Sequence, residues 1–291
     1  MLGYPFMQRA LIAALLTGLL APAIGSYVVQ RRLSLLGDGL GHVAIAGVGL
    51  AFITKTSPIP VAVVVCVIGA VLVEVLRQRG KASGDVGLAI LFYGGLASGV
   101  LLSGAAGAGT GTLSQYLFGS LTTVSSEDLT VIGILSALVL IPAIGLAPRL
   151  FAVSADEDFA KGVGLKVRVY NLLIVVLAAV TVTLAMRTVG LLLVSALMVI
   201  PVAAAQNLVR GFQLTLASGM AIGVLAAIGG VTISYQIDLA PGALIVVIAI
   251  GLFVISWPLG AWWRRPRRIA TVRLDETSSR QQLAGDHPGQ H

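Results

Sequence analysis

Long apolar runs recur along nearly the whole of this 291-residue chain, and they constrain its fold more than any other feature. Each run approaches the roughly 20 residues that an α-helix needs to cross the hydrocarbon core of a bilayer. Hydrophobic residues make up 57% of the chain and charged residues only 11%, which is far from the balance of a soluble domain. Strand-like segments are effectively absent. The sequence therefore predicts an all-α bundle of membrane-spanning helices.

The apolar runs predict nine helices, with boundaries that carry errors of about two to four residues. The predicted helices cover residues 8–29, 35–54, 58–77, 85–104, 128–148, 169–187, 189–209, 213–234 and 242–263. Eight spans are an alternative, because some of these segments could be short or broken. Residues 1–263 would then form one transmembrane domain. Residues 264–291 are polar, lack apolar periodicity and are predicted to be a disordered, basic tail.

Basic residues gather in short clusters between the apolar runs, and these clusters predict the orientation of the chain. If the clusters and the tail face the cytoplasm, only Arg9, Lys55 and Arg187 of the 19 lysines and arginines lie outside. Cytoplasmic segments of membrane proteins carry such an excess of positive charge. We therefore expect an external N-terminus and a cytoplasmic C-terminus. The net charge of +7 reflects this topology rather than nucleic-acid binding.

Asp38 and His42 are the outstanding candidate functional residues. His42 is the only histidine before the tail, and it follows Asp38 by four residues, so both side chains would project from one face of a helix. Ionisable groups at membrane depth are costly, and they commonly mark ion pathways. Aspartate and histidine also suit divalent transition metals. The pair predicts a metal site, and the alternative is a hydrogen-bonded pair that staples two helices together.

A charged segment interrupts the apolar runs at residues 149–168. Ser154 precedes Glu157 by three residues, a spacing that predicts a capping box, and Gly162 and Gly164 would end the helix. The pattern indicates a short amphipathic helix on the cytoplasmic face. It is either a structured loop or a docking element for a soluble partner.

Other charged positions allow simpler interpretations. Asp238 lies just before a Pro-Gly turn, where it could contact cations at an outer mouth or accept backbone hydrogen bonds at a helix end. Glu74 and Arg77 have the spacing of an ion pair near the cytoplasmic end of a helix. No GxxxxGK[ST] pattern occurs, so the sequence predicts no ATPase activity in this chain.

Five motifs in order resemble the permeases of zinc, manganese and iron ABC importers, and the zinc-uptake branch in particular. The resemblance runs from about residue 10 to 262 and departs at Gly41, where the family usually has serine or alanine. The motifs are residues 31–47 with Gly37-Asp38 and His42, Gln115–Gly119 with Val124–Leu129, Asp158-Phe159-Ala160 with Gly162 and Gly164, Val189–Pro201, and Ala240–Ala243.

The resemblance implies a non-enzymatic homodimer of the vitamin B12-type (type II-like) architecture in a bacterial cytoplasmic (inner) membrane. A cytoplasmic ABC ATPase dimer and an extracytoplasmic metal-binding protein would be its partners. Asp38 and His42 would contact the transported metal, expected to be zinc, with manganese and iron as alternatives and no permanent cofactor. The residues implied in coupling to the ATPase are Asp156, Glu157, Asp158, Phe159, Ala160, Gly162 and Gly164.

Two readings from other classes remain open on the residues alone. A secondary cation carrier or channel would need no ATPase, so the acidic cytoplasmic helix would be dispensable. An intramembrane hydrolase could use Asp38 and His42 as zinc ligands or acid–base groups. It is the weaker alternative, because the membrane core has no second histidine and no HExxH or GxSxG pattern.

Overall fold

The computed structural model describes residues 4–79, 84–107, 115–119, 125–237 and 239–263, and these ranges contain helices but no strand. The helices are α1 (Pro5–Gln30), α2 (Leu36–Thr54), α3 (Pro58–Gln78), α4 (Gly84–Ala105), α6 (Ser126–Gly145), α7 (Ala147–Ala155), α8 (Glu157–Gly162), α9 (Val167–Thr188), α10 (Leu191–Leu208), α11 (Phe212–Ile237) and α12 (Pro241–Trp263). Within the described ranges, eight helices are long and apolar enough to cross a membrane, and α10 has a shorter apolar part. The all-α prediction of eight to nine spans is confirmed.

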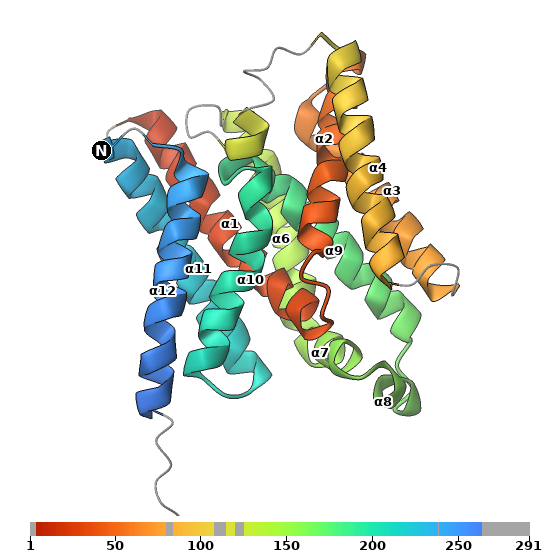
Figure 1. The fold of residues 1–291 in the computed structure, drawn as a ribbon, viewed down its shortest axis with the longest axis vertical. Helices are drawn as coiled ribbons and strands as arrows, with labels where there is room; N and C mark the ends of the chain where they lie inside the picture. Colours follow the sequence, from red (N-terminus) through yellow and green to blue (C-terminus); the bar gives the residue numbers. More distant parts are fainter. Residues whose placement is uncertain (1–3, 80–83, 108–114, 120–124, 238, 264–291) are drawn as a thin grey trace, which may run out of the picture.

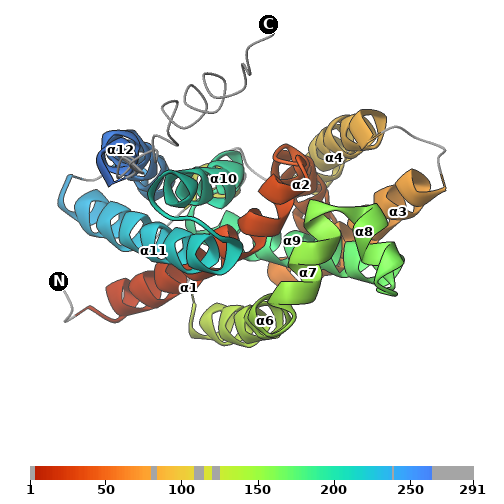
Figure 2. The same ribbon diagram turned by 90° about the horizontal axis from the view of Figure 1, so that it is seen from below.

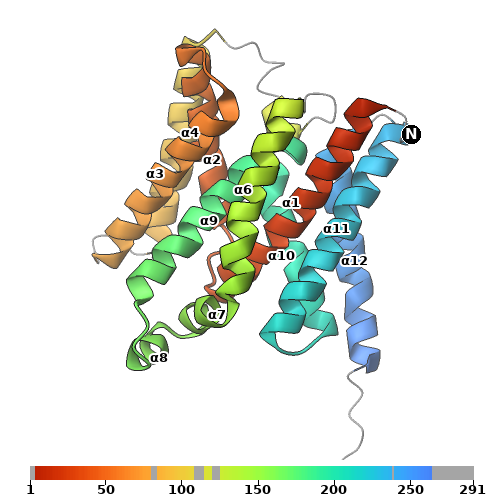
Figure 3. The same ribbon diagram turned by 180° about the vertical axis from the view of Figure 1, so that it is seen from behind.

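Helices α1 and α9 form the centre of the bundle. Most of their residues are buried, as expected for helices that are apolar all round. Figure 2 shows α2, α3 and α4 on one side of this centre and α10, α11 and α12 on the other. Figure 3 shows α6 against α1 and α9 on the remaining face. The first side group contacts the centre through α9, whereas α10 and α6 contact both α1 and α9.

The first and the last described residues lie at opposite ends of the bundle (Figure 1). Helices α7 and α8 lie across the end at which α12 finishes, and the last turns of α1, α3 and α10 point toward that end as well. The basic residues Arg31, Arg77 and Arg210 lie in or next to these helix ends. Their segregation agrees with the predicted alternation of the helices.

Glycines and short polar side chains hold α1 close to α11 and α9. A Cβ atom on Gly18 of α1 would lie 2.8 Å from the carbonyl oxygen of Gly223 in α11, so only glycine permits this approach. The buried hydroxyls of Thr17 in α1 and Thr188 in α9 share a hydrogen bond of 2.9 Å. On the other side, the Cys66 thiol of α3 donates to the Leu40 carbonyl of α2 at 3.3 Å.

Helix ends differ from the predicted boundaries where local chemistry decides them. Helix α6 begins at Ser126, before the predicted 128, because Ser125 and Asp128 form a reciprocal capping box. Helix α10 begins at Leu191 because Gly190 has a φ of +89° and cannot continue a helix. Residues 115–118 form a helical turn between α4 and α6. The tail, residues 264–291, lies outside the described residues.

Candidate functional site

The start of α2 places Asp38 inside the bundle rather than at its end. The connection after α1 turns back toward the interior, so α2 begins well above the ends of α10 and α12 in Figure 1. Glycines make room there. A Cβ on Gly37 would approach the Ser195 hydroxyl of α10 to 2.5 Å, and one on Gly39 would approach the Leu91 side chain of α4 to 2.9 Å. The first turn of α2 is thus wedged between α4 and α10.

Asp38 and His42 lie one turn apart on α2, and both face α4. Both side chains are half-buried. Asp38 lines a pocket of about 340 Å³ whose other lining residues are Leu35, Leu88, Ala89, Phe92 and Tyr93. The His42 ring meets Phe92 edge-on, with ring centroids 4.3 Å apart. The predicted pair therefore opens toward a groove between α2 and α4.

The hydrogen bonding of His42 bears on whether it is a ligand or a structural residue. Its Nδ1 atom is buried and has no hydrogen-bond partner in the described part of the chain. Buried polar atoms are nearly always paired in folded proteins, so an orphaned ring nitrogen requires an explanation. A helix staple made through Nδ1 would give this atom a partner. An unpaired ring nitrogen is available as a metal donor.

One chain supplies only part of a metal-binding set. Among the described residues, no group of three or more His, Cys, Asp or Glu side chains is placed to hold an ion. Zinc usually takes four ligands, and harder cations such as manganese take more oxygen donors. Asp38 and His42 would therefore need further donors from water, from a second copy of the chain, or from neighbours such as the buried Ser195 hydroxyl beside Gly37.

The predicted cytoplasmic helix exists, but its cap differs from the prediction. Ser154 lies inside α7, so the predicted Ser154–Glu157 capping box is wrong. Asp156 caps α8 instead, because its extended backbone lets the carboxylate accept from the backbone N–H groups of Asp158 and Phe159 at 2.9 Å each. Gly164, with a φ of +84°, turns the chain after α8. A short surface helix with acids at its start is therefore present.

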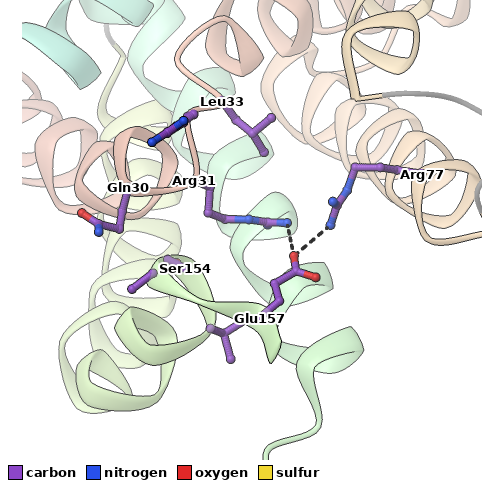
Figure 4. Close-up of a pocket in the computed structure, with 9 residues that line it drawn as sticks. Gln30, Arg31, Leu33, Arg77, Ser154 and Glu157 are labelled. Atoms are coloured by element: carbon purple, nitrogen blue, oxygen red, sulfur yellow. Dashed lines mark hydrogen bonds and ion pairs between the residues drawn. The ribbon is translucent and has the colours of Figure 1, made fainter. Parts of the chain in front are cut away.

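The predicted coupling residues fall into two groups. Phe159 is 63% exposed, and the Asp158 side chain is exposed and paired only with Lys161 of the same helix. Gly162 has open space around it. By contrast, Ala160 is fully buried, and Glu157 reaches toward the bundle rather than away from it (Figure 4). The exposed group can touch a partner directly, whereas Ala160 is covered and the Glu157 carboxylate is engaged by the bundle, although its side chain is 37% exposed.

The structure brings together four charged residues, Arg31, Glu74, Arg77 and Glu157. The sequence predicted only the Glu74–Arg77 pair among them. The predicted Glu74–Arg77 pair is present, with two hydrogen bonds of 2.9 Å. Arg31 and Glu157 join it from distant parts of the chain. Burial lowers the pKa of the Arg31 guanidinium, and the Glu74 and Glu157 carboxylates oppose that shift.

A second polar cluster lies at the opposite end of the bundle. Arg187 of α9 pairs with Asp128 of α6 at 2.7 Å and donates to the Tyr116 hydroxyl at 2.8 Å. Burial raises the pKa of Tyr116, and Arg187 acts in the opposite direction. The cluster holds residues 115–119 against α6 and α9. Asp238, the predicted outer contact, lies outside the described residues, and its role stays a prediction.

Comparison with known proteins settles which family these features belong to. A model of the ABC 3 transport family matches residues 3–259, which is most of the chain. The chain belongs to the ABC 3 transport family. The predicted resemblance to metal ABC permeases is confirmed.

Relatives of this ABC 3 permease carry metal-transport names. It is 32% identical over 203 residues to the manganese import system permease protein ScaB of Streptococcus parasanguinis, which covers 69% of this chain and 72% of that protein. It is 33% identical over 207 residues to the manganese transport system membrane protein MntC of Halalkalibacterium halodurans, covering 70% of each. The solved structure of PsaBC from Streptococcus pneumoniae in complex with Fab has a chain that matches with a TM-score of 0.79 at 29% identity, covering 89% of this chain and 94% of that one.

Family membership fixes the general role of the ABC 3 permease. It is a multi-pass membrane protein and the permease subunit of a metal ABC importer. ATP hydrolysis in such transporters belongs to a separate subunit, so the chain is a transport subunit rather than an enzyme. The family works with an ATPase and a substrate-binding protein.

Proposed function

We propose that this permease moves a divalent transition metal past Asp38 and His42. The single observation that carries the proposal is the buried Nδ1 of His42, which has no partner among the described residues and lies one turn from a carboxylate on the same helix face. Such groups are costly at membrane depth unless a substrate uses them. Two donors per chain would bind an ion weakly, which suits conduction because the ion must leave as readily as it enters.

The cargo that we propose is manganese ahead of zinc. The sequence motifs point to the zinc-uptake branch, but ScaB and MntC are both named for manganese, so zinc has no specific support among these relatives. Aspartate oxygen and imidazole nitrogen suit both metals, and iron as well. The choice therefore depends on the remaining ligands and on the protein that delivers the ion. No permanently bound cofactor is part of this proposal.

The assembly that we propose is a homodimer with the α7–α8 end in the cytoplasm of a bacterial cell. Two copies would bring two Asp38–His42 pairs together and provide the four ligands that one chain lacks. The basic residues near α7 and α8, with few at the other end, favour this orientation. An extracytoplasmic metal-binding protein would then deliver the ion to the end that carries Arg187, and the C-terminus would be cytoplasmic.

The proposal is tested by metal uptake in cells that lack their own importers. The cells carry this permease with its ATPase and binding protein, and radioactive manganese and zinc are offered separately. We expect manganese uptake to exceed zinc uptake and to stop when the ATPase is replaced by a variant that binds but cannot hydrolyse ATP. Uptake that survives this replacement would identify a secondary carrier or channel. A preference for zinc would overturn only the choice of cargo.

The exposed part of α8 gives a second test. We expect Phe159→Asp, alone or with Gly162→Glu, to lower uptake severely and to release the ATPase from the purified permease. The reason is that an apolar, 63% exposed side chain on a charged surface helix is the natural anchor in a partner's pocket. Phe159→Leu, which keeps the apolar surface, should retain most of the uptake. Normal uptake and normal ATPase binding by Phe159→Asp would show that α8 is only a structured loop.

A further inference from the structure

Helix α8 has little apolar packing of its own. It spans six residues, and its buried side chain is Ala160, which packs with Val153 of α7 and Val167 of α9. Phe159 and Asp158 face outward. A helix this short and this poorly buried needs another connection to the bundle if a movement of α8 is to displace the other helices.

Glu157 provides that connection. Its Oε1 atom accepts a hydrogen bond of 2.9 Å from the Asn171 side chain of α9. The same oxygen lies 3.4 Å from Nη2 of Arg77 in α3 and 3.5 Å from Nη2 of Arg31, which follows α1. Figure 4 shows both guanidinium groups converging on this carboxylate. One oxygen of α8 thus touches three different parts of the bundle.

The charges around Glu157 are balanced, and two of them are buried. The Arg31 side chain is 5% exposed and that of Glu74 is 3% exposed, and they lie 3.9 Å apart. Arg77 holds Glu74 through two hydrogen bonds, and Gln78 adds a third at 3.0 Å. Two carboxylates therefore face two guanidinium groups. Separating the buried Arg31 and Glu74 from their partners would leave buried charges uncompensated, so the cluster is expected to move as a unit.

Arg31 connects this cluster to the metal site. Only residues 32–35 separate it from α2, whose first turn carries Asp38. Arg32 has a left-handed backbone conformation with a φ of +57°. The connection between α1 and α2 is therefore short and conformationally restricted. A displacement of Arg31 would therefore be passed to the start of α2.

Space beside the cluster permits such a displacement. A cavity of about 320 Å³ lies among the end of α1, the end of α7 and Glu157, and its lining includes Arg31, Arg77 and Ser154 (Figure 4). The Ser154 hydroxyl and the Nη1 atom of Arg31 are buried without hydrogen-bond partners in the described residues. The cluster thus has both room and unused donors for a second arrangement, as a two-state element requires.

We infer that Glu157 is a positioning residue that links α8 to the metal site through Arg31, Arg77 and Asn171. In this arrangement the outer face of α8 binds the ATPase, while its inner carboxylate moves the α1–α2 connection and so the position of Asp38. The inference rests on the proposed function, because it takes α8 as the ATPase contact and Asp38 as a metal ligand. Its new part is the set of residues that connects α8 to Asp38.

The test is the number of metal ions imported per ATP hydrolysed, measured with the complete transporter in proteoliposomes. The variants are Glu157→Gln, which removes the charge, and Asn171→Leu, which removes the shortest contact without changing charge and lies where the ATPase cannot reach it. We expect each variant to keep the ATPase bound and to lower the ratio at least about fivefold, the lower limit of typical coupling between sites. The double variant should be no worse than the more severe single variant, because both break one link.

Glu127→Gln is the matched control, since it makes the same chemical change on an exposed carboxylate at the opposite end of the bundle. Its ratio should equal that of the wild type. If Glu157→Gln fails to accumulate as a folded protein, the charge-neutral Asn171→Leu variant carries the test. A wild-type ratio in Asn171→Leu, or loss of the ATPase from Glu157→Gln, would overturn the inference. If the wild-type transporter itself imports no metal with ATP, the proposed function fails instead, so the two failures are distinguishable.

Discussion

Replacing His42 with alanine should abolish ATP-driven metal uptake, and replacing Asp38 with asparagine should reduce it strongly. Each change removes one of the two donors that a single chain offers. Loss of an outer-shell partner of a metal ligand already costs about 10–100-fold, so loss of a direct ligand should cost about 100-fold or more. The measurement is the initial rate of radioactive manganese uptake at equal amounts of permease in the membrane.

Changes of donor type distinguish a ligand from a structural residue. In His42→Asp, an oxygen donor replaces imidazole, and the ratio of manganese to zinc uptake should rise because oxygen ligands suit manganese better. A residue that only packs against Phe92 would not alter this ratio. Glu127→Gln, on an exposed carboxylate, serves as the control for the charge lost in Asp38→Asn. Wild-type uptake by His42→Ala would show that the pair is structural, even if the transporter remains dependent on ATP.

Gly190→Ala should destabilise the folded permease by about 2–6 kcal/mol. Gly190 has a φ of +89°, where a side chain adds strain of roughly 1–3 kcal/mol. Its Cβ would also lie 2.5 Å from the Leu117 carbonyl oxygen, and overpacking of this kind costs about 1–3 kcal/mol more. The effect would appear as a lower unfolding temperature in detergent and as weaker protection of residues 115–119 from proteolysis.

Gly251→Ala is the matched control for that prediction. No atom of the described residues lies within 4 Å of the position of its Cβ, and the residue is exposed in the middle of α12. Alanine has the higher helix propensity, so this variant should be neutral or more stable by up to about 1 kcal/mol. Equal unfolding temperatures for the two variants would contradict the conclusion that Gly190 fixes the turn between α9 and α10.

The helices could be predicted from sequence because burial in lipid requires a long apolar run for each span. The ends of the helices could be predicted only where a single residue in the sequence was able to cap the helix. At residues 154–157 both Ser154 and Asp156 can cap a helix, and the sequence does not say which one is free. The structure chooses Asp156, because α7 continues through Ser154 while Leu150 and Val153 are buried against the bundle.

The candidate metal site was predictable in part, because a four-residue spacing fixes which side chains share a helix face. The orphaned nitrogen of His42 was not predictable, since it depends on which atoms α4 brings near the ring. The same holds for the meeting of Arg31 with Glu157, which lie 126 positions apart. A sequence shows charges and their local spacing. Contacts between distant segments follow only from how the helices pack.

Cys66 has a practical consequence for following this transporter at work. It is the only cysteine of the chain, and it is fully buried in α3 with its thiol bound to the Leu40 carbonyl. Buried thiols of this kind are inert toward labelling reagents. Site-directed spin or fluorophore labels can therefore be introduced without first removing Cys66. A cysteine placed at the exposed Val163, just after α8, would carry the only reporter on the molecule.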